Sequence, residues 1–209
     1  MSVARKSGSG SHWRQRQGRD TYFQLASERD VRSRAYFKLE QIQKKERILK
    51  PGSTCADLGS TPGGWSQYAA SIVGKRGSVL AVDLEPMAAL DGVTFLQGDF
   101  TLESTQHAIK DALQCSLLDL VMSDMAPKLT GNRSVDQPRL MALAEDALSF
   151  SEICLRPGGL FLVKLFQGEG FESFVSLVRG RFQSIRLLKP QASRPESREM
   201  YLLARNYRI

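Results

Sequence analysis

Cysteine and histidine are both scarce in this chain of 209 residues. The cysteines, Cys55, Cys115 and Cys154, lie far apart and form no CxxC pair, which argues against a disulfide framework or a zinc site. We expect them to be reduced side chains of a cytoplasmic protein. The histidines, His12 and His107, lie near none of the motifs described below, so we expect no bound metal.

Long hydrophobic runs are missing as well. No apolar stretch approaches the roughly 20 residues that a membrane-spanning helix needs, and no apolar segment follows the basic N-terminus as in a secretory signal. The pattern GxGxxG, which cradles the pyrophosphate of a dinucleotide, is also absent. No feature indicates an obligate partner chain, so we expect a monomer with no attachment to a membrane.

Positive charge is concentrated in the first quarter of the chain. The net charge is +7, and residues 1–50 contain 13 Lys or Arg against 5 Asp or Glu, whereas the remainder contains 16 against 17. This excess indicates either a polyanionic partner or a solubilising segment, and charge alone leaves both open. Residues 1–19, rich in Ser, Gly, Arg and Gln, predict a flexible basic arm. Apolar spacing predicts a helical extension over residues 20–50, at the start of a single domain over 20–209.

Beyond residue 52, short apolar runs alternate with helical segments. This alternation predicts a mainly parallel sheet with helices on both faces. The segment between the last two strands is too short for a parallel crossover. We therefore predict an α/β, Rossmann-like fold with a seven-stranded, mostly parallel sheet and an antiparallel last strand. The predicted strands cover residues 53–58, 78–82, 93–96, 117–123, 160–166, 184–188 and 200–204, and the predicted helices cover 67–72, 105–113, 140–154 and 171–182.

A glycine-rich turn and several acids mark a candidate ligand site. The stretch DLGSTPGGW, residues 57–65, follows the first strand and lets a ligand lie against bare main chain. Asp83 ends the second strand, where a carboxylate can accept from ribose hydroxyls. Asp99 follows the third strand and could accept from an adenine amino group. Such carboxylates, beside a loop without phosphate geometry, suit an adenosyl ligand that carries a sulfonium. Trp65 either shields that ligand or packs in the core.

Two lysines occupy apolar settings. Lys164 interrupts the apolar strand GLFLVKLF, where burial would lower the pKa of the amine enough to make it a base near neutral pH. The alternative is a frayed strand end at which the lysine reaches solvent. Lys38 shares the apolar face of its helix, although its stem could also extend to water. Asp124 ends the fourth strand at the same sheet edge and could hold either lysine. Glu199, which begins the last strand, would by default be an exposed turn residue.

The order Lys38, Asp124, Lys164 and Glu199, together with DLGSTPGGW, resembles the FtsJ family of methyltransferases, whose hallmark is a Lys-Asp-Lys-Glu tetrad. The motifs SRAYFKL, QGDF, MSDMAP, VDQPR, VKLFQGEGF and SRE also occur in the order of the family, so the likeness covers nearly the whole chain after the arm. It is similar above all to the bacterial branch, which methylates a uridine 2′-hydroxyl of 23S ribosomal RNA. One departure is Ser60-Thr61, where the family usually has two alanines; we expect a changed loop contact rather than lost binding.

The resemblance implies a cofactor, a partner and a set of site residues. The cofactor would be S-adenosylmethionine, with S-adenosylhomocysteine as product, and the partner would be ribosomal RNA in the large ribosomal subunit or its late precursor. Residues 20–209 would form the catalytic domain, with Lys164 as the principal catalytic residue supported by Lys38, Asp124 and Glu199. Cofactor contacts would lie at Gly63, Trp65, Asp83, Asp99 and Asp124.

Four alternatives differ in class. One is a 2′-O-methyltransferase of transfer RNA or of an mRNA cap. An NAD-dependent oxidoreductase is disfavoured by the missing GxGxxG, and an amino-group methyltransferase by Asp124-Met125-Ala126-Pro127 where an Asn-Pro-Pro-Tyr-like loop is expected. A non-enzymatic RNA-binding module would explain the basic N-terminus but not the two lysines. For RNA binding, Arg32 and Arg34 are the best candidates for phosphate contacts.

Overall fold

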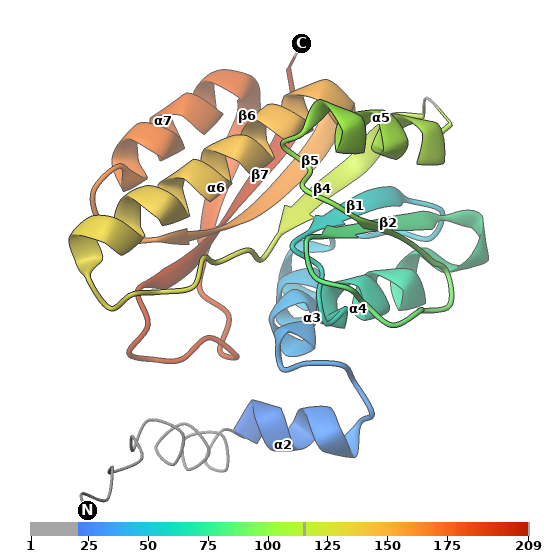
Figure 1. Cartoon of the computed structure of the whole chain (residues 1–209), viewed down its shortest axis with the longest axis horizontal. Helices are drawn as coiled ribbons and strands as arrows, with labels where there is room; N and C mark the ends of the chain where they lie inside the picture. The colour runs from blue at the N-terminus through green and yellow to red at the C-terminus, as the bar shows by residue number, and fades with distance from the viewer. Residues whose placement is uncertain (1–20, 115, 209) are drawn as a thin grey trace, which may run out of the picture.

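A computed structural model describes residues 21–114 and 116–208, which build a seven-stranded sheet between two layers of helices (Figure 1). The strands run in the order β3-β2-β1-β4-β5-β7-β6. The strand bounds are β1 (Thr54–Leu58), β2 (Ser78–Asp83), β3 (Val93–Gln97), β4 (Leu118–Ser123), β5 (Leu155–Phe166), β6 (Phe182–Leu188) and β7 (Glu199–Tyr207).

The helices divide between the two faces of the sheet. An apolar cluster that includes Leu39 and Tyr68 joins α3 and α4 to one face, and a second cluster that includes Ile109, Leu148 and Phe174 joins α5, α6 and α7 to the other. The central strands are buried on both faces, which explains their nearly continuous apolar sequences. The helix bounds are α2 (Thr21–Glu28), α3 (Ala35–Glu46), α4 (Gly64–Val73), the 3₁₀ turn η1 (Gly74–Arg76), α5 (Glu103–Ala112), α6 (Arg133–Cys154) and α7 (Phe171–Arg181).

The predicted fold class is confirmed. Strands β1 to β5 pair in parallel, whereas β7 runs antiparallel to both of its neighbours, β5 and β6. The chain proceeds outward from β1 to β3 in one direction and then returns to β4 on the other side of β1. In sheets of this kind ligands bind beyond the carboxyl ends of the strands at the point of reversal. The fold therefore directs attention to the loops after β1 and β4.

Two element boundaries differ from the sequence prediction for identifiable reasons. The prediction began the long helix at residue 140, after Pro138, but α6 begins at Arg133 and runs through that proline. The Asn132 side chain caps this helix by accepting a hydrogen bond from the Ser134 backbone amide at 3.1 Å. The predicted helical extension over 20–50 consists of two helices, α2 and α3, separated by a short connection.

The structure describes two of the three cysteines and leaves the predicted N-terminal arm outside its range. Cys55 and Cys154 are buried free thiols, and Cys115 lies outside the described residues. The arm predicted over residues 1–19 also lies outside them. No helix within the two described ranges is both long and apolar enough to cross a membrane.

Candidate active site

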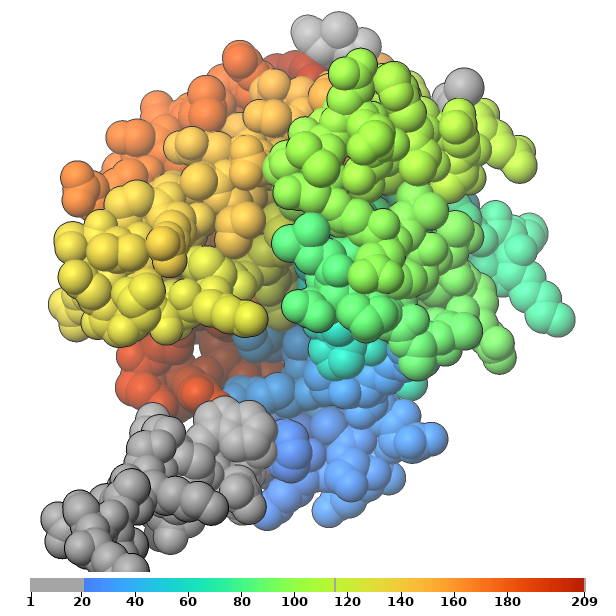
Figure 2. All heavy atoms as spheres, viewed as in Figure 1, coloured from blue at the N-terminus to red at the C-terminus, as the bar shows by residue number. Residues whose placement is uncertain are grey.

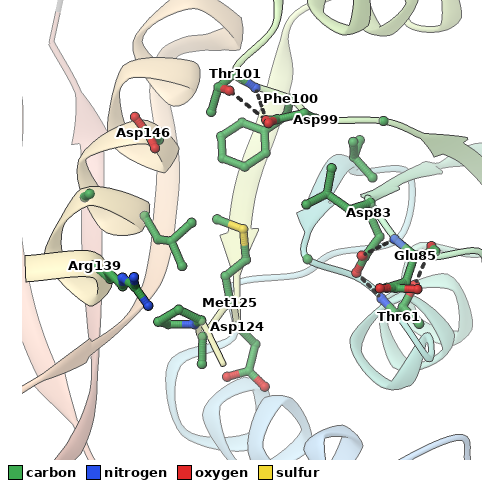
Figure 3. A pocket seen from close by; sticks show the side chains of 18 of the residues that line it. Thr61, Asp83, Glu85, Asp99, Phe100, Thr101, Asp124, Met125, Arg139 and Asp146 are labelled. Atoms are coloured by element: carbon green, nitrogen blue, oxygen red, sulfur yellow. Dashed lines mark hydrogen bonds between the residues drawn. The ribbon is translucent and has the colours of Figure 1, made fainter. Parts of the chain in front are cut away.

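A pocket of about 920 Å³ opens at the carboxyl ends of β1, β2, β3 and β4. Asp83, Asp99 and Asp124 all line it, so the structure brings together three acids that the sequence placed at separate strand ends. Figure 3 shows these acids around the pocket, with Arg139 and Asp146 facing them from α6. The pocket is thus formed by sheet edge on one side and helix on the other.

The loop after β1 is fixed by Asp83. One carboxylate oxygen of Asp83 accepts a hydrogen bond from the Thr61 backbone amide at 2.8 Å, and the other accepts from the Glu85 amide at 2.9 Å (Figure 3). Each oxygen keeps a further lone pair for a ligand. Gly59 has a φ of +74°, and a Cβ built there would lie 2.2 Å from Met125 Cγ. Only glycine therefore lets the first loop approach the loop after β4 so closely.

The Ser60-Thr61 pair changes the contacts of this loop without blocking the pocket. The Thr61 hydroxyl donates to the backbone oxygen of Glu85 at 3.1 Å, a bond that alanine would not make. The Ser60 hydroxyl is buried and has no hydrogen-bond partner among the described residues. The altered loop contact expected from the sequence is therefore present in the hydrogen bond from Thr61.

The upper part of the pocket combines one acid with apolar walls. Asp99 Oδ1 accepts from the Thr101 backbone amide at 2.9 Å and from its hydroxyl at 2.7 Å, so the carboxylate is held in one orientation (Figure 3). Leu84, Phe100 and Leu143 contribute apolar surface beside it. A flat apolar ring with an exocyclic amino group would fit between these walls while donating to Asp99.

The predicted tetrad of Lys38, Asp124, Lys164 and Glu199 assembles at the edge of this pocket. Lys164 Nζ lies 3.1 Å from Asp124 Oδ1 and also donates to the Asp124 backbone oxygen. Lys38 Nζ lies 2.8 Å from Glu199 Oε1 and 3.9 Å from Asp124 Oδ1. The Lys164 side chain is only 7% exposed, so it does not reach solvent as a frayed strand end would allow. Because Asp124 belongs to both groups, the tetrad and the pocket share one carboxylate.

The sequence interpretation missed a fifth member of this cluster, Tyr201. Its fully buried hydroxyl donates to Asp124 Oδ1 at 2.6 Å and accepts from Lys38 Nζ at 3.0 Å. In the β5–β7 register Tyr201 is paired with Lys164. The signal that would have found it is the two-residue period of a strand, since Tyr201 and Glu199 lie on the same face of β7.

The charges around Asp124 set its pKa. Burial alone would raise the pKa of this carboxyl, but Lys164, Lys38 and the hydrogen bonds from Tyr201 and Lys164 together hold it below its ordinary value. Asp124 is therefore an anion that balances the two lysines. The tetrad and Tyr201 thus form one network of two lysines, two acids and a phenol.

A neighbouring acid behaves in the opposite way. Asp57 is completely buried at the end of β1, and burial raises its pKa from 3.8 to about 7. The Ser66 hydroxyl donates to it at 2.6 Å, which opposes the rise, while the charges of Asp124 and Asp83 add to it. Asp57 is absent from the pocket lining, and its hydrogen bond with Ser66 connects the end of β1 to α4.

Two of the predicted cofactor contacts, Gly63 and Trp65, lie outside the pocket lining. Trp65 is buried in the core, where its indole N–H donates to the Ala35 backbone oxygen at 2.9 Å and its ring lies 5.7 Å from that of Tyr201. Gly63 caps α4 with a φ of +106°, and a Cβ there would lie 3.1 Å from Arg32 Cδ. Both residues thus shape the site from behind in this structure.

Arg32 and Arg34, the candidates for phosphate contacts, are held by backbone carbonyls. The Arg32 guanidinium donates to the oxygens of Pro62, Ala88 and Ala89, which joins the segment before α3 to the loops after β1 and β2. Arg34 donates to the Ala192 oxygen in the segment before β7. These bonds give each arginine a structural task that the charge pattern of the sequence did not indicate.

Comparison with known proteins identifies the class and then the family. The chain is similar to a Plasmodium falciparum protein that is assigned as a ribosomal RNA methyltransferase. The crystal structure of that protein has a TM-score of 0.77 to this chain at 28% identity, and the match covers 85% of this chain and 98% of that one. A Clostridium thermocellum protein assigned as an rRNA methylase has a TM-score of 0.55 at 18% identity, covering 80% and 96%. A Streptococcus mutans protein assigned as a methyltransferase, in complex with S-adenosylhomocysteine, has a TM-score of 0.51 at 12% identity, covering 77% and 90%.

These structures and this chain share one fold, the fold of S-adenosylmethionine-dependent methyltransferases. The family model of FtsJ-like methyltransferases matches residues 31–207. The chain belongs to the FtsJ-like methyltransferase family, as the resemblance of its motifs predicted.

Proposed function

We propose that this protein transfers the methyl group of S-adenosylmethionine to the 2′-hydroxyl of a uridine in the 23S RNA of the large ribosomal subunit or its late precursor. The observation that carries the proposal is the position of Asp124, which lines the cofactor pocket and also holds Lys164. A methyl donor in the pocket and a ribose at Lys164 would then meet at one carboxylate. The family and the ribosomal RNA methyltransferase assignment of the Plasmodium falciparum protein support RNA as the substrate.

The residues that line the pocket support S-adenosylmethionine as its ligand. Asp83 and Asp99 would accept hydrogen bonds from the ribose hydroxyls and the adenine amino group, while Leu84, Phe100 and Leu143 would enclose the ring. The bound cofactor supplies an electrophilic methyl group on a cationic sulfur. Gly63 and Trp65 would act from behind by fixing the start of α4.

Lys164 would perform the central task at the ribose oxygen. An ammonium has three hydrogens, and Lys164 directs two of them at Asp124, which leaves the third for the 2′ oxygen. In this ion pair the lysine stabilises the negative charge that develops on the oxygen during attack. If the amine first loses its proton, it can instead accept the hydroxyl proton. Either route places Lys164 in direct contact with the reacting oxygen.

Lys38 and Glu199 would position the substrate ribose and keep the cluster neutral. Glu199 also accepts from the Ser193 hydroxyl at 2.8 Å, so the segment before β7 is tied to the network. The fixed cluster would align oxygen, methyl carbon and sulfur, and such alignment supplies a large part of the rate enhancement in two-substrate reactions.

We further expect the protein to act as a monomer in the cytoplasm.

A methyl-transfer assay tests the proposal. Large ribosomal subunits from a strain that lacks this protein would be incubated with tritiated-methyl S-adenosylmethionine, and the labelled nucleotide and atom would be mapped. We expect label on one uridine ribose of the 23S RNA and none with the Lys164→Ala variant. Parallel arms with transfer RNA and capped RNA test the second candidate substrates. Label on a base, or only in one of these other RNAs, would overturn the assignment to the 23S uridine ribose.

A further inference from the structure

A second pocket, of about 220 Å³, lies beside the tetrad and shares no lining residue with the cofactor pocket. Phe166 of its wall is two residues beyond Lys164 on β5 and pairs in register with Glu199 of β7. Arg198 of its rim directly precedes Glu199. Arg133, on the opposite rim, begins α6. Figure 2 shows the surface hollowed where the yellow start of α6 meets the red segment before β7.

The floor of this pocket is rigid. Gln137 is 6% exposed, and its side-chain amide donates to the backbone oxygens of Phe166 at 3.1 Å and Glu169 at 2.9 Å. Two carbonyl acceptors fix which end of the amide is nitrogen, because the reversed orientation would place three oxygens together. The backbone of Gly168 lies so close that a Cβ there would be 2.8 Å from the amide carbon. The loop after β5 is thereby fastened to α6.

The loop that leads into α6 is fixed as well. The Asp136 carboxylate accepts from the Thr130 amide at 2.8 Å, from the Thr130 hydroxyl at 2.8 Å and from the Gly131 amide at 2.9 Å. These hydrogen bonds hold the Asp136 carboxylate against its own loop. The pocket between the two fastened loops is preformed, and a ligand that enters it loses little energy to reorganisation of the protein.

The chemistry of the pocket suits one nucleotide of a single strand. Phe166, Leu129 and Leu140 supply apolar surface for a base, and an aromatic ring is a general platform for base stacking. Arg133 and Arg198 supply cations for the adjoining phosphates, and the amino-terminal end of α6 adds a partial positive charge beside Arg133. Glu196 on the rim is exposed and can turn to solvent.

We propose that this pocket is the subsite for the nucleotide next to the methylated one in the RNA strand. The proposal rests on the proposed function, since it assumes that an RNA ribose lies at Lys164. Two residues along a strand span about 7 Å. A single nucleotide linkage covers this distance, so a neighbour of the target nucleotide reaches Phe166 without distortion of the strand.

Charge reversal on the rim tests the subsite. Arg133→Glu is compared with the wild-type enzyme and with Arg179→Glu, which makes the same charge change on an exposed arginine of α7. Kinetics with large ribosomal subunits should show at least a tenfold rise in KM for Arg133→Glu and a shallower salt dependence of binding, with no change for Arg179→Glu. The Kd for S-adenosylmethionine should stay within twofold of the wild-type value in both. Equal subunit KM values for the two variants would overturn the subsite.

The aromatic wall and the identity of the bound nucleotide are tested separately. Phe166→Leu keeps an apolar side chain but removes the ring, so it should raise KM for subunits, and Phe166→Tyr should restore it. A benzophenone photo-crosslinker in place of the exposed Leu129 should attach to a nucleotide adjoining the methylated one. Crosslinks only to distant RNA would overturn the proposal, whereas a wild-type enzyme that methylates no RNA would overturn the proposed function itself.

Discussion

The hydroxyl of Tyr201 donates a 2.6 Å hydrogen bond to the carboxylate of Asp124 in the interior of the protein. The same hydroxyl oxygen accepts from Lys38 at 3.0 Å, so the phenol connects a cation with an anion that lie 3.9 Å apart. Burial, followed by the charges of Asp124 and Glu199, raises the pKa of Tyr201 well above its ordinary value. The phenol is therefore a permanent hydrogen-bond donor that holds the network in one geometry.

Replacement of Tyr201 by phenylalanine tests this role. The variant leaves buried polar groups without a partner, so unfolding free energy should fall by about 1–3 kcal/mol. The hydrogen bond from Tyr201 helps to lower the pKa of Asp124, so its loss raises that pKa and moves the acid limb of the kcat/KM profile to higher pH. Tyr207→Phe, which removes a phenol bonded to the Glu152 backbone, is the matched control. An acid limb that coincides with that of the wild-type enzyme would argue against the positioning role.

Replacement of Lys164 by alanine should separate chemistry from cofactor binding. Loss of the group at the ribose oxygen should reduce single-turnover methylation by roughly 10²–10⁴-fold. The Kd for S-adenosylmethionine, measured by calorimetry, should change only a few-fold because Lys164 does not line the cofactor pocket. Lys75→Ala, at an exposed lysine of η1, controls for the loss of a positive charge. Methylation at the wild-type rate in Lys164→Ala would refute the catalytic assignment.

The pH dependence of stability should carry the signature of Asp57. Its pKa is about 7 in the folded protein against 3.8 for the free group, so the folded state binds more protons between these values. The free energy of unfolding therefore falls as pH rises from about 4 to 7, because Asp57 must lose its proton in the interior of the folded protein. Asp57→Asn keeps an acceptor for Ser66 but cannot ionise. The variant should gain stability relative to the wild type across this window, by at most about 4 kcal/mol.

Denaturant unfolding at several pH values measures this difference. Asp111→Asn, at an exposed position on α5, makes the same chemical change away from the core and is the matched control. The pKa of Asp124 is lowered below its ordinary value, so the stability that this acid contributes is lost on acidification, in the opposite sense to the effect of Asp57. If Asp57→Asn and the wild type keep a constant difference between pH 4 and 7, Asp57 does not titrate in that window.

Arg32→Ala should act on the cofactor rather than on the RNA. Its guanidinium donates to Pro62 in the loop after β1 and to Ala88 and Ala89 in the loop after β2, so its loss frees two loops that border the cofactor pocket. KM for S-adenosylmethionine should rise about tenfold, equivalent to roughly 1.4 kcal/mol, while KM for ribosomal subunits changes less. Arg34→Ala, whose partner lies before β7, should leave KM for the cofactor unchanged. If Arg32→Ala instead raises KM for ribosomal subunits and leaves KM for S-adenosylmethionine unchanged, Arg32 contacts RNA phosphate.

The fold and Lys164 leave local marks in the sequence, whereas the tetrad as a set, and Glu199 above all, was predicted from the resemblance to the family. Burial of an unpaired lysine is unfavourable, so a lysine inside an apolar strand indicates a partner, and the sequence alone singles out Lys164. The structure supplies that partner as Asp124, from a strand 40 residues earlier in the chain. Acids at strand ends were equally visible, since parallel strands bring their carboxyl ends to one edge.

The features that the sequence did not indicate depend on packing between distant segments. Tyr201 looks like an ordinary strand aromatic, and its role follows only from its contacts with Lys38 and Asp124. Arg32 looked like a phosphate ligand because nothing in its neighbourhood along the chain predicts carbonyls from residues 62, 88 and 89. Because proline disfavours the interior of a helix, the prediction began the long helix after Pro138. In the structure α6 runs through this proline, since tertiary context can override a local preference.

The place of β7 in the sheet determines how the tetrad is assembled. This strand is the last along the chain, yet it lies between β5 and β6. Before β7 is inserted, β6 has no neighbouring strand to pair with, and Lys38 lacks both the carboxylate and the phenol that β7 carries. The tetrad is therefore completed by the insertion of β7 between β5 and β6, whereas the strands that carry the pocket, β1 to β4, pair with one another without it.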